Sequence, residues 1–118
     1  MKVRILAAVC VVAISGCATS IPEMRDRGPQ KSFTSQKSEQ EVAECILFAW
    51  QDEAFAGVRS EVTLQPRPGG GKSVVNEGQR EMADVIGGKN KTKVEFFTNG
   101  GGMSWISVRR AASIKPCL

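Results

Sequence analysis

The sequence predicts an α+β fold in which an N-terminal helix packs on a three- to four-stranded antiparallel sheet. A short C-terminal helix and one disulfide are expected to complete it. Three observations predict this fold. Apolar residues recur at helical spacing after Ser38, they alternate with polar residues after Gly57, and glycine-rich breaks separate the alternating segments. With 118 residues the chain is long enough for one small domain.

The predicted helix begins at Ser38 and ends before Gly57. Ser38 and Glu41 have the spacing of a capping box, in which each side chain satisfies a backbone donor at the start of the helix. Apolar residues such as Ile46 and Trp50 cover more than one face of this helix, so we expect most of it to be buried. Gly57 is a suitable residue to end it.

Four segments are expected to form strands, namely 58–65, 72–76, 82–86 and 92–98. Residues 103–114 fit either a strand or a helix. We expect a short helix, because Ala111 and Ala112 continue the helical pattern and a helix would return Cys117 towards Cys45.

Two further features of the chain are expected to be structural. Trp50 and Trp105 are expected in the core. The glycine run at 100–102 is expected to form a loose turn, with close approach of the backbone to a ligand as the alternative.

The first 16 residues have the organisation of a signal peptide. Lys2 and Arg4 supply positive charge, and residues 5–14 form a run of ten uncharged apolar residues. This run is too short for a membrane-spanning helix, which needs about 20 residues, but it suits the apolar region of a signal peptide. Small residues at 15 and 16 then precede Cys17.

Residues 14–17, Ile-Ser-Gly-Cys, resemble the lipobox of bacterial lipoproteins, in which Leu, a small residue and Gly or Ala precede the cysteine. Ile14 in place of Leu is the one departure. The resemblance implies cleavage before Cys17, a diacylglyceryl group on its sulfur and an acyl chain such as palmitate on its amine. Ala18, where an Asp favours the inner membrane, implies the outer membrane, facing the periplasm. The alternative is an ordinary secretory signal with an incidental Cys17.

The chain is accordingly expected to divide into three parts. Residues 1–16 would be the signal peptide, 17–37 the lipidated cysteine with a flexible tether, and 38–118 the folded domain. The tether is predicted because residues 18–37 contain Pro22, Gly28 and Pro29, with mixed charges and no periodicity. A flexible coil of this length would have a root-mean-square reach of about 25 Å.

The chain has four cysteines. Cys10 belongs to the leader and Cys17 is the lipid site, which leaves Cys45 and Cys117. Disulfides persist in an oxidising exported compartment, so we expect a bridge between these two. The bridge would close a loop of 117 − 45 = 72 residues and contribute roughly 4 kcal/mol to stability. Two free thiols or a metal pair are the alternatives, although two cysteines without His make a poor zinc site.

Charge and composition exclude several functions. The chain has 16 Lys and Arg and 12 Asp and Glu, and without Lys2 and Arg4 the net charge is 14 − 12 = +2. This is too small to indicate binding to nucleic acid. With no His the chain has neither a catalytic triad nor a His-based metal site, so we expect no catalysis, metal or cofactor. Asp52 and Glu53 are adjacent on the helix and do not face each other.

Arg109, Arg110 and Lys115 form a basic cluster near the C-terminus. The favoured interpretation is a solvated face at the C-terminal end of a helix. The alternative is an anion site for phosphates of lipids or carboxylates of peptidoglycan peptides.

The mature domain also resembles small lipoproteins of proteobacteria. The shared features are a Cys near the start of the helix, a Trp soon after it, a Gly-rich hairpin and a terminal Cys. This resemblance implies no activity. We therefore expect a membrane-anchored envelope lipoprotein with a non-catalytic binding or structural role, whose partner is an envelope protein or peptidoglycan. The alternative is an inhibitor or immunity-type protein directed against an envelope-targeting enzyme.

Overall fold

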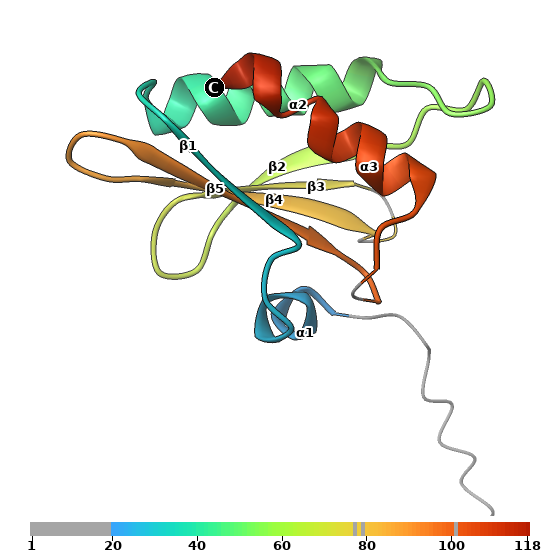
Figure 1. Cartoon of the computed structure of the whole chain (residues 1–118), viewed down its shortest axis with the longest axis horizontal. Helices are drawn as coiled ribbons and strands as arrows, with labels where there is room; N and C mark the ends of the chain where they lie inside the picture. The colour runs from blue at the N-terminus through green and yellow to red at the C-terminus, as the bar shows by residue number, and fades with distance from the viewer. Residues whose placement is uncertain (1–19, 77, 79, 101) are drawn as a thin grey trace, which may run out of the picture.

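The computed structural model describes residues 20–76, 78, 80–100 and 102–118. Five strands form one antiparallel sheet in the order β1-β5-β4-β3-β2, with helices on both faces (Figure 1). The strands are β1 (Lys31–Ser35), β2 (Val62–Pro66), β3 (Lys72–Asn76), β4 (Glu81–Gly87) and β5 (Thr92–Thr98). The helices are α1 (Ile21–Asp26), α2 (Glu39–Asp52), α3 (Trp105–Ala112) and the short 3-10 helix η2 (Lys115–Cys117). The predicted α+β class and antiparallel sheet are confirmed.

Helix α2 covers one face of the sheet, with α3 and η2 on the same side (Figure 1). Ser38 caps it as predicted, because the Ser38 hydroxyl accepts a hydrogen bond from the Glu41 amide at 3.2 Å. Burial of each large aliphatic side chain contributes about 1.5–3 kcal/mol, so this layer supplies much of the stability. Its core comprises Val42, Ile46 and Trp50 from α2 and Val74, Val85, Val94 and Phe96 from the sheet.

Helix α2 ends at Asp52, several residues before the predicted stop at Gly57. Phe55 and Val58 exchange two backbone hydrogen bonds of 2.9 and 3.0 Å around a tight turn. Ala56 and Gly57 form this turn with φ values of 51° and 77°, which a continuing helix does not allow. As a result β2 begins at Val62, and the strand expected from residue 58 starts later than predicted.

The structure corrects the predicted tether. Residues 21–26 form α1, and residues 31–35 form β1, which pairs with β5 and gives the sheet five strands rather than three or four. Ser20 caps α1 by accepting a hydrogen bond from the Glu23 amide at 3.3 Å. The apolar side chain of Phe33 packs against the core below α2, which explains why this polar segment is ordered.

Helix α1 packs on the opposite face of the sheet from α2 (Figure 1). Met24 is buried there against Val75, Met82 and Phe97, with Ile21 at the edge. This second apolar cluster fixes the start of the described chain to the sheet.

A buried ion cluster holds α1 beside this second apolar cluster. Asp84 of β4 is 1% exposed and accepts hydrogen bonds from Arg25 at 2.8 and 3.1 Å, from Arg67 at 3.2 Å and from Ser73 at 2.6 Å. Burial alone would raise the pKa of Asp84. The hydrogen bonds from Arg25, Ser73 and Arg67 and the charge of Arg25 outweigh that effect and hold the pKa of Asp84 below its ordinary value.

The C-terminal segment is fastened by the predicted disulfide. Cys45 of α2 is bonded to Cys117 of η2, with 5.6 Å between their Cα atoms. Residues 105–112 are helical as expected. The Ser35 hydroxyl donates to the Leu118 carbonyl oxygen at 3.3 Å, so β1 also contacts the C-terminus. None of the helices in the described ranges is long and apolar enough to span a bilayer.

We predict that Asp84→Asn lowers the free energy of unfolding at neutral pH by roughly 3 kcal/mol, because two arginines lose their buried partner. A carboxyl with a depressed pKa in the folded state stabilises the fold above its unfolded pKa of about 3.9, and this contribution is lost as pH falls through the folded pKa. The difference between the variant and the wild type should therefore shrink in acid. Urea unfolding titrations of both proteins from neutral to acidic pH measure this difference.

Asp52→Asn is the matched control, since the side chain of Asp52 is 86% exposed and contacts only Arg59 at 3.7 Å among the described ion pairs. Its stability should follow the wild type at every pH. A constant difference between Asp84→Asn and the wild type across the pH range would contradict the role assigned to the carboxylate.

Candidate functional site

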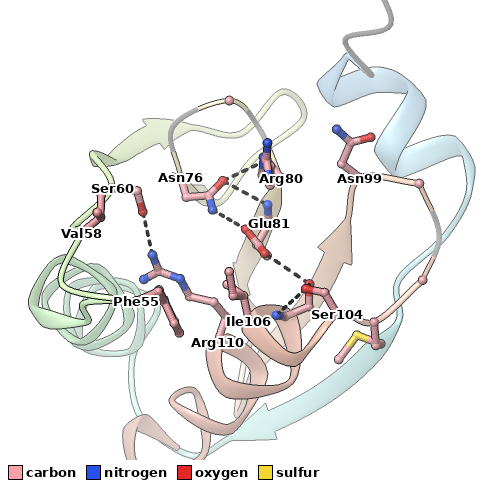
Figure 2. A pocket seen from close by; sticks show the side chains of 15 residues that line it. Phe55, Val58, Ser60, Asn76, Arg80, Glu81, Asn99, Ser104, Ile106 and Arg110 are labelled. Atoms are coloured by element: carbon pink, nitrogen blue, oxygen red, sulfur yellow. Dashed lines mark hydrogen bonds between the residues drawn. The ribbon is translucent and has the colours of Figure 1, made fainter.

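An open groove of about 1010 Å³ lies beside the N-terminal half of α3 (Figure 2). The loop between α2 and β2 forms one wall and α3 forms another. Described residues next to the ends of β3, β4 and β5 form the rest. Phe55, Val58, Met103 and Ile106 make its apolar lining, and Ser60, Asn76, Glu81, Asn99, Ser104 and Arg110 make most of its polar lining.

The wall next to α3 is fixed by local hydrogen bonds. Ser104 caps α3, because its hydroxyl accepts from the Ser107 amide at 3.1 Å. The Thr98 hydroxyl donates to the Gly102 carbonyl oxygen at 2.7 Å and thereby holds the loop that leaves β5. Gly100 and Gly102 line the groove, so part of the predicted glycine turn belongs to this site.

Glu81, at the start of β4, places a carboxylate in the groove. Glu81 is 3% exposed; its carboxylate accepts from the Ser107 hydroxyl at 3.2 Å and from the Asn76 side-chain amide. The side-chain oxygen Oδ1 of Asn76 in turn accepts hydrogen bonds from the backbone amides of Arg80 and Glu81 at 2.9 and 3.0 Å. Both donors to this carboxylate are neutral, and no ion pair among the described residues includes Glu81.

Arg110 enters the same groove from α3 and is 1% exposed. Its guanidinium donates to the Trp50 carbonyl oxygen at 2.6 Å and to the Ser60 hydroxyl at 2.8 Å (Figure 2 draws the bond to Ser60). The guanidinium carbon lies 4.9 Å from the centroid of the Phe55 ring and 5.5 Å from that of the Trp50 ring. Among the described residues, the buried Nε of Arg110 has no hydrogen-bond partner.

The charge of Arg110 is incompletely compensated. Burial lowers the pKa of Arg110 from its ordinary value, and the charges of Glu53 and Glu81 act in the opposite direction. A guanidinium nevertheless stays protonated in proteins, so a positive charge remains in the wall of the groove. Buried charges are normally paired, yet no ion pair among the described residues includes Arg110.

The groove therefore combines a cation that has a spare donor with a carboxylate that has spare lone pairs. A carboxylate has about four acceptor sites, and only two donors reach Glu81 in the described structure. This arrangement is suited to a ligand that carries both an acceptor and a donor.

Aromatic and aliphatic side chains are exposed next to the groove. Phe55 and Trp105 meet edge to face with 5.6 Å between ring centroids, and Arg109 lies 5.2 Å from the Phe55 centroid. Trp105 is 60% exposed and Val58 is 68% exposed. The prediction that Trp105 is a core residue was wrong, because its helical position places it on the outer face of α3, whereas Trp50 is buried as predicted.

The basic residues that the sequence grouped together are separated in the structure. Arg110 is buried in the wall of the groove, whereas Arg109 and Lys115 are exposed. Adjacent residues of a helix point in directions about 100° apart, which separates Arg109 from Arg110. Cys17 lies outside the described residues.

Glu81 and Ser60 were not identified as site residues from the sequence. Each is a single polar residue, and β4 itself was predicted to begin only at Met82. Their proximity to Arg110 comes from the tertiary fold, and no local pattern in the sequence indicates it.

The two carboxylates that were weighed as a catalytic pair have separate partners. Asp52 contacts Arg59, and Glu53 accepts a hydrogen bond from the Ser113 hydroxyl. Within the described part of the chain, no three residues of the types His, Cys, Asp and Glu are grouped so that they could hold a metal ion.

Comparisons of the chain with protein-family models, with curated proteins and with solved structures found no match.

We predict that Arg110→Lys lowers the free energy of unfolding by about 1–2 kcal/mol, because one ammonium cannot replace the planar fork that bonds both Trp50 and Ser60. Trp50 fluorescence should change as well, since the Trp50 ring loses its guanidinium neighbour. Arg109→Lys is the matched control and should leave both readouts close to the wild type. Equal effects of the two substitutions on stability would contradict a special role for Arg110.

Proposed function

We propose that this chain is a lipoprotein of the cell envelope, anchored through lipid on Cys17 in the outer membrane and facing the periplasm. The groove beside α3 is its ligand site, and its role is non-catalytic binding. The lipobox-like residues 14–17 and the apolar leader support the anchor. The Cys45–Cys117 disulfide is consistent with an exported, oxidising location.

The observation that supports the binding role is the burial and incomplete hydrogen bonding of Arg110. A fully buried arginine, whose Nε has no hydrogen-bond partner among the described residues, lies in the wall of an open groove. Buried donors without a partner are rare in folded proteins and require an explanation. A ligand that supplies the missing acceptor explains why the charge is retained.

The position of α1 also affects how the domain would meet the membrane. Only Ala18 and Thr19 separate Cys17 from Ser20, so the link spans at most about 10 Å at the reach of an extended chain. Phe97, which packs against Met24 of α1, lies two residues before Asn99 at the rim of the groove. The groove would therefore work close to the bilayer rather than at the end of a long tether.

A second candidate function is inhibition of an envelope-targeting enzyme. The exposed side chains of Trp105 and Val108 favour it, because residues three apart share one face of a helix and neighbouring apolar groups on a surface often mark protein contacts. In this case the occupant of the groove would be a segment of a protein.

We predict that protein purified from membranes has the mass of a chain beginning at Cys17 plus acyl groups, and that reduction adds the mass of two hydrogens. Cys17→Ser should abolish the acylation and release the protein from the membrane fraction. Cys10→Ser should leave both unchanged, since Cys10 is removed with the leader. An unlipidated chain with Cys17 intact would contradict the anchor.

We also predict that a photo-crosslinking residue at Val58, at the groove, forms adducts in intact cells. The same residue at Lys91, in the hairpin at the other end of β4 and β5, should not form them. Arg110→Lys should reduce the Val58 adducts. Equal adducts at both positions, or none at Val58, would contradict a binding role for the groove. An adduct to a hydrolase would favour the inhibitor role over the first proposal.

A further inference from the structure

We infer that the groove binds a short peptide with free termini, with its carboxylate at Arg110 and its ammonium group at Glu81. This inference rests on the proposed binding role of the same groove and specifies the class of ligand. It follows from the two buried charges, from their unused hydrogen-bonding capacity and from the shape of the lining.

The Arg110 end is suited to a carboxylate. Arginine presents planar, parallel N–H groups that match the two oxygens of a carboxylate. Among the described residues Nε has no partner, and Nη2 donates only to the Ser60 hydroxyl. That hydroxyl can turn its own hydrogen to the same carboxylate, so Ser60 and Arg110 together offer up to three donors.

Reaching Nε requires a movement of the chain. The Nε atom is covered, and the loop that carries Phe55 and Ser60 forms the adjacent wall. Within this loop the described backbone hydrogen bonds are the two between Phe55 and Val58. The inferred binding therefore includes a displacement of this loop when the ligand binds.

The Glu81 end is suited to an ammonium group. Its carboxylate is buried and receives hydrogen bonds from Asn76 and Ser107, and neither of these donors carries a charge. An ammonium group has three donors and no acceptor, so it complements a carboxylate with spare lone pairs.

The presence of both charges decides against simpler ligands. A phosphate or other simple anion at Arg110 would be repelled by the nearby Glu81 carboxylate, and a simple amine at Glu81 would be repelled by Arg110. A ligand with one positive and one negative end is attracted at both.

The size and lining of the groove indicate a peptide rather than a single amino acid. A volume of about 1010 Å³ lies at the upper end of the range typical of sites for drug-sized ligands. Phe55, Val58, Met103 and Ile106 supply apolar surface between the two charged ends. This surface suits small aliphatic side chains of a peptide of a few residues.

The test measures binding of alanine tripeptide to the full-length protein by calorimetry, alongside the N-acetylated peptide, its C-terminal amide and inorganic phosphate. We expect the free peptide to bind at least about tenfold more tightly than either capped form, and phosphate to bind more weakly still. Binding of phosphate alone, equal binding of all three peptides, or no binding at millimolar concentration would overturn the inference.

Two substitutions assign the ends of the ligand. Glu81→Gln should remove the preference for the free amine, so that the free and acetylated peptides bind alike. Arg110→Lys should remove most of the preference for the free carboxylate over the amide. Glu61→Gln and Arg109→Lys, both at exposed residues, are the matched controls and should retain both preferences. Unchanged preferences in Glu81→Gln and Arg110→Lys would overturn the assignment.

Amide chemical shifts of the wild-type protein provide a test that needs no variant. The peptide should shift the signals of Ser60, Gly102 and Ser104, and leave those of Gly88 and Lys91 unchanged. Shifts confined to the distant hairpin would overturn the inference. If no peptide binds but Val58 still crosslinks in cells, the ligand class is wrong while the binding role of the groove stands.

Discussion

Two hydrogen bonds of opposite direction between Trp50 and Arg110 hold the C-terminal helix on the core. The Trp50 indole donates to the Arg110 carbonyl oxygen at 3.1 Å, and the Arg110 guanidinium donates to the Trp50 carbonyl oxygen at 2.6 Å. The Cys45–Cys117 disulfide fastens the same segment further along. These connections fix α3 relative to α2 and thereby create the groove, since α3 is one of its walls. Arg110, which helps to build this wall, is also the residue whose Nε has no hydrogen-bond partner in the part of the chain that the structure describes.

Buried charged side chains on the two faces of the sheet differ in their hydrogen-bond partners. On the α1 face Asp84 receives hydrogen bonds from two arginines and from Ser73, so its charge is neutralised and bonded. On the α2 face Arg110 and Glu81 have neutral partners, although both are buried in one groove. The partners of Asp84 show that this fold can surround a buried charge with oppositely charged side chains. The incomplete pairing beside α3 therefore supports the proposed ligand site.

Sequence periodicity predicted the elements whose own residues decide their structure. The Ser38 cap of α2, the strands β2 to β5 and the disulfide follow from local patterns or cysteine parity. The sequence contained one signal that was not used, because Ser20 and Glu23 repeat the capping-box spacing at the start of α1. Strand β1 has no such signal, since Phe33 is its one apolar residue and its order depends on pairing with β5. The groove could not be predicted, because it assembles side chains from four separate segments.

The order found at residues 20–35 bears directly on how a tethered domain would work. A flexible link of 20 residues would let the groove sample a wide volume, whereas α1 is bound to the sheet through Met24 and through the Arg25–Asp84 pair. If Cys17 carries lipid, two residues separate it from Ser20, where the described structure begins. Ligands would then reach the groove only near the membrane surface, where the local concentration of a membrane-bound partner is high. A modest intrinsic affinity at Arg110 and Glu81 would suffice in that setting.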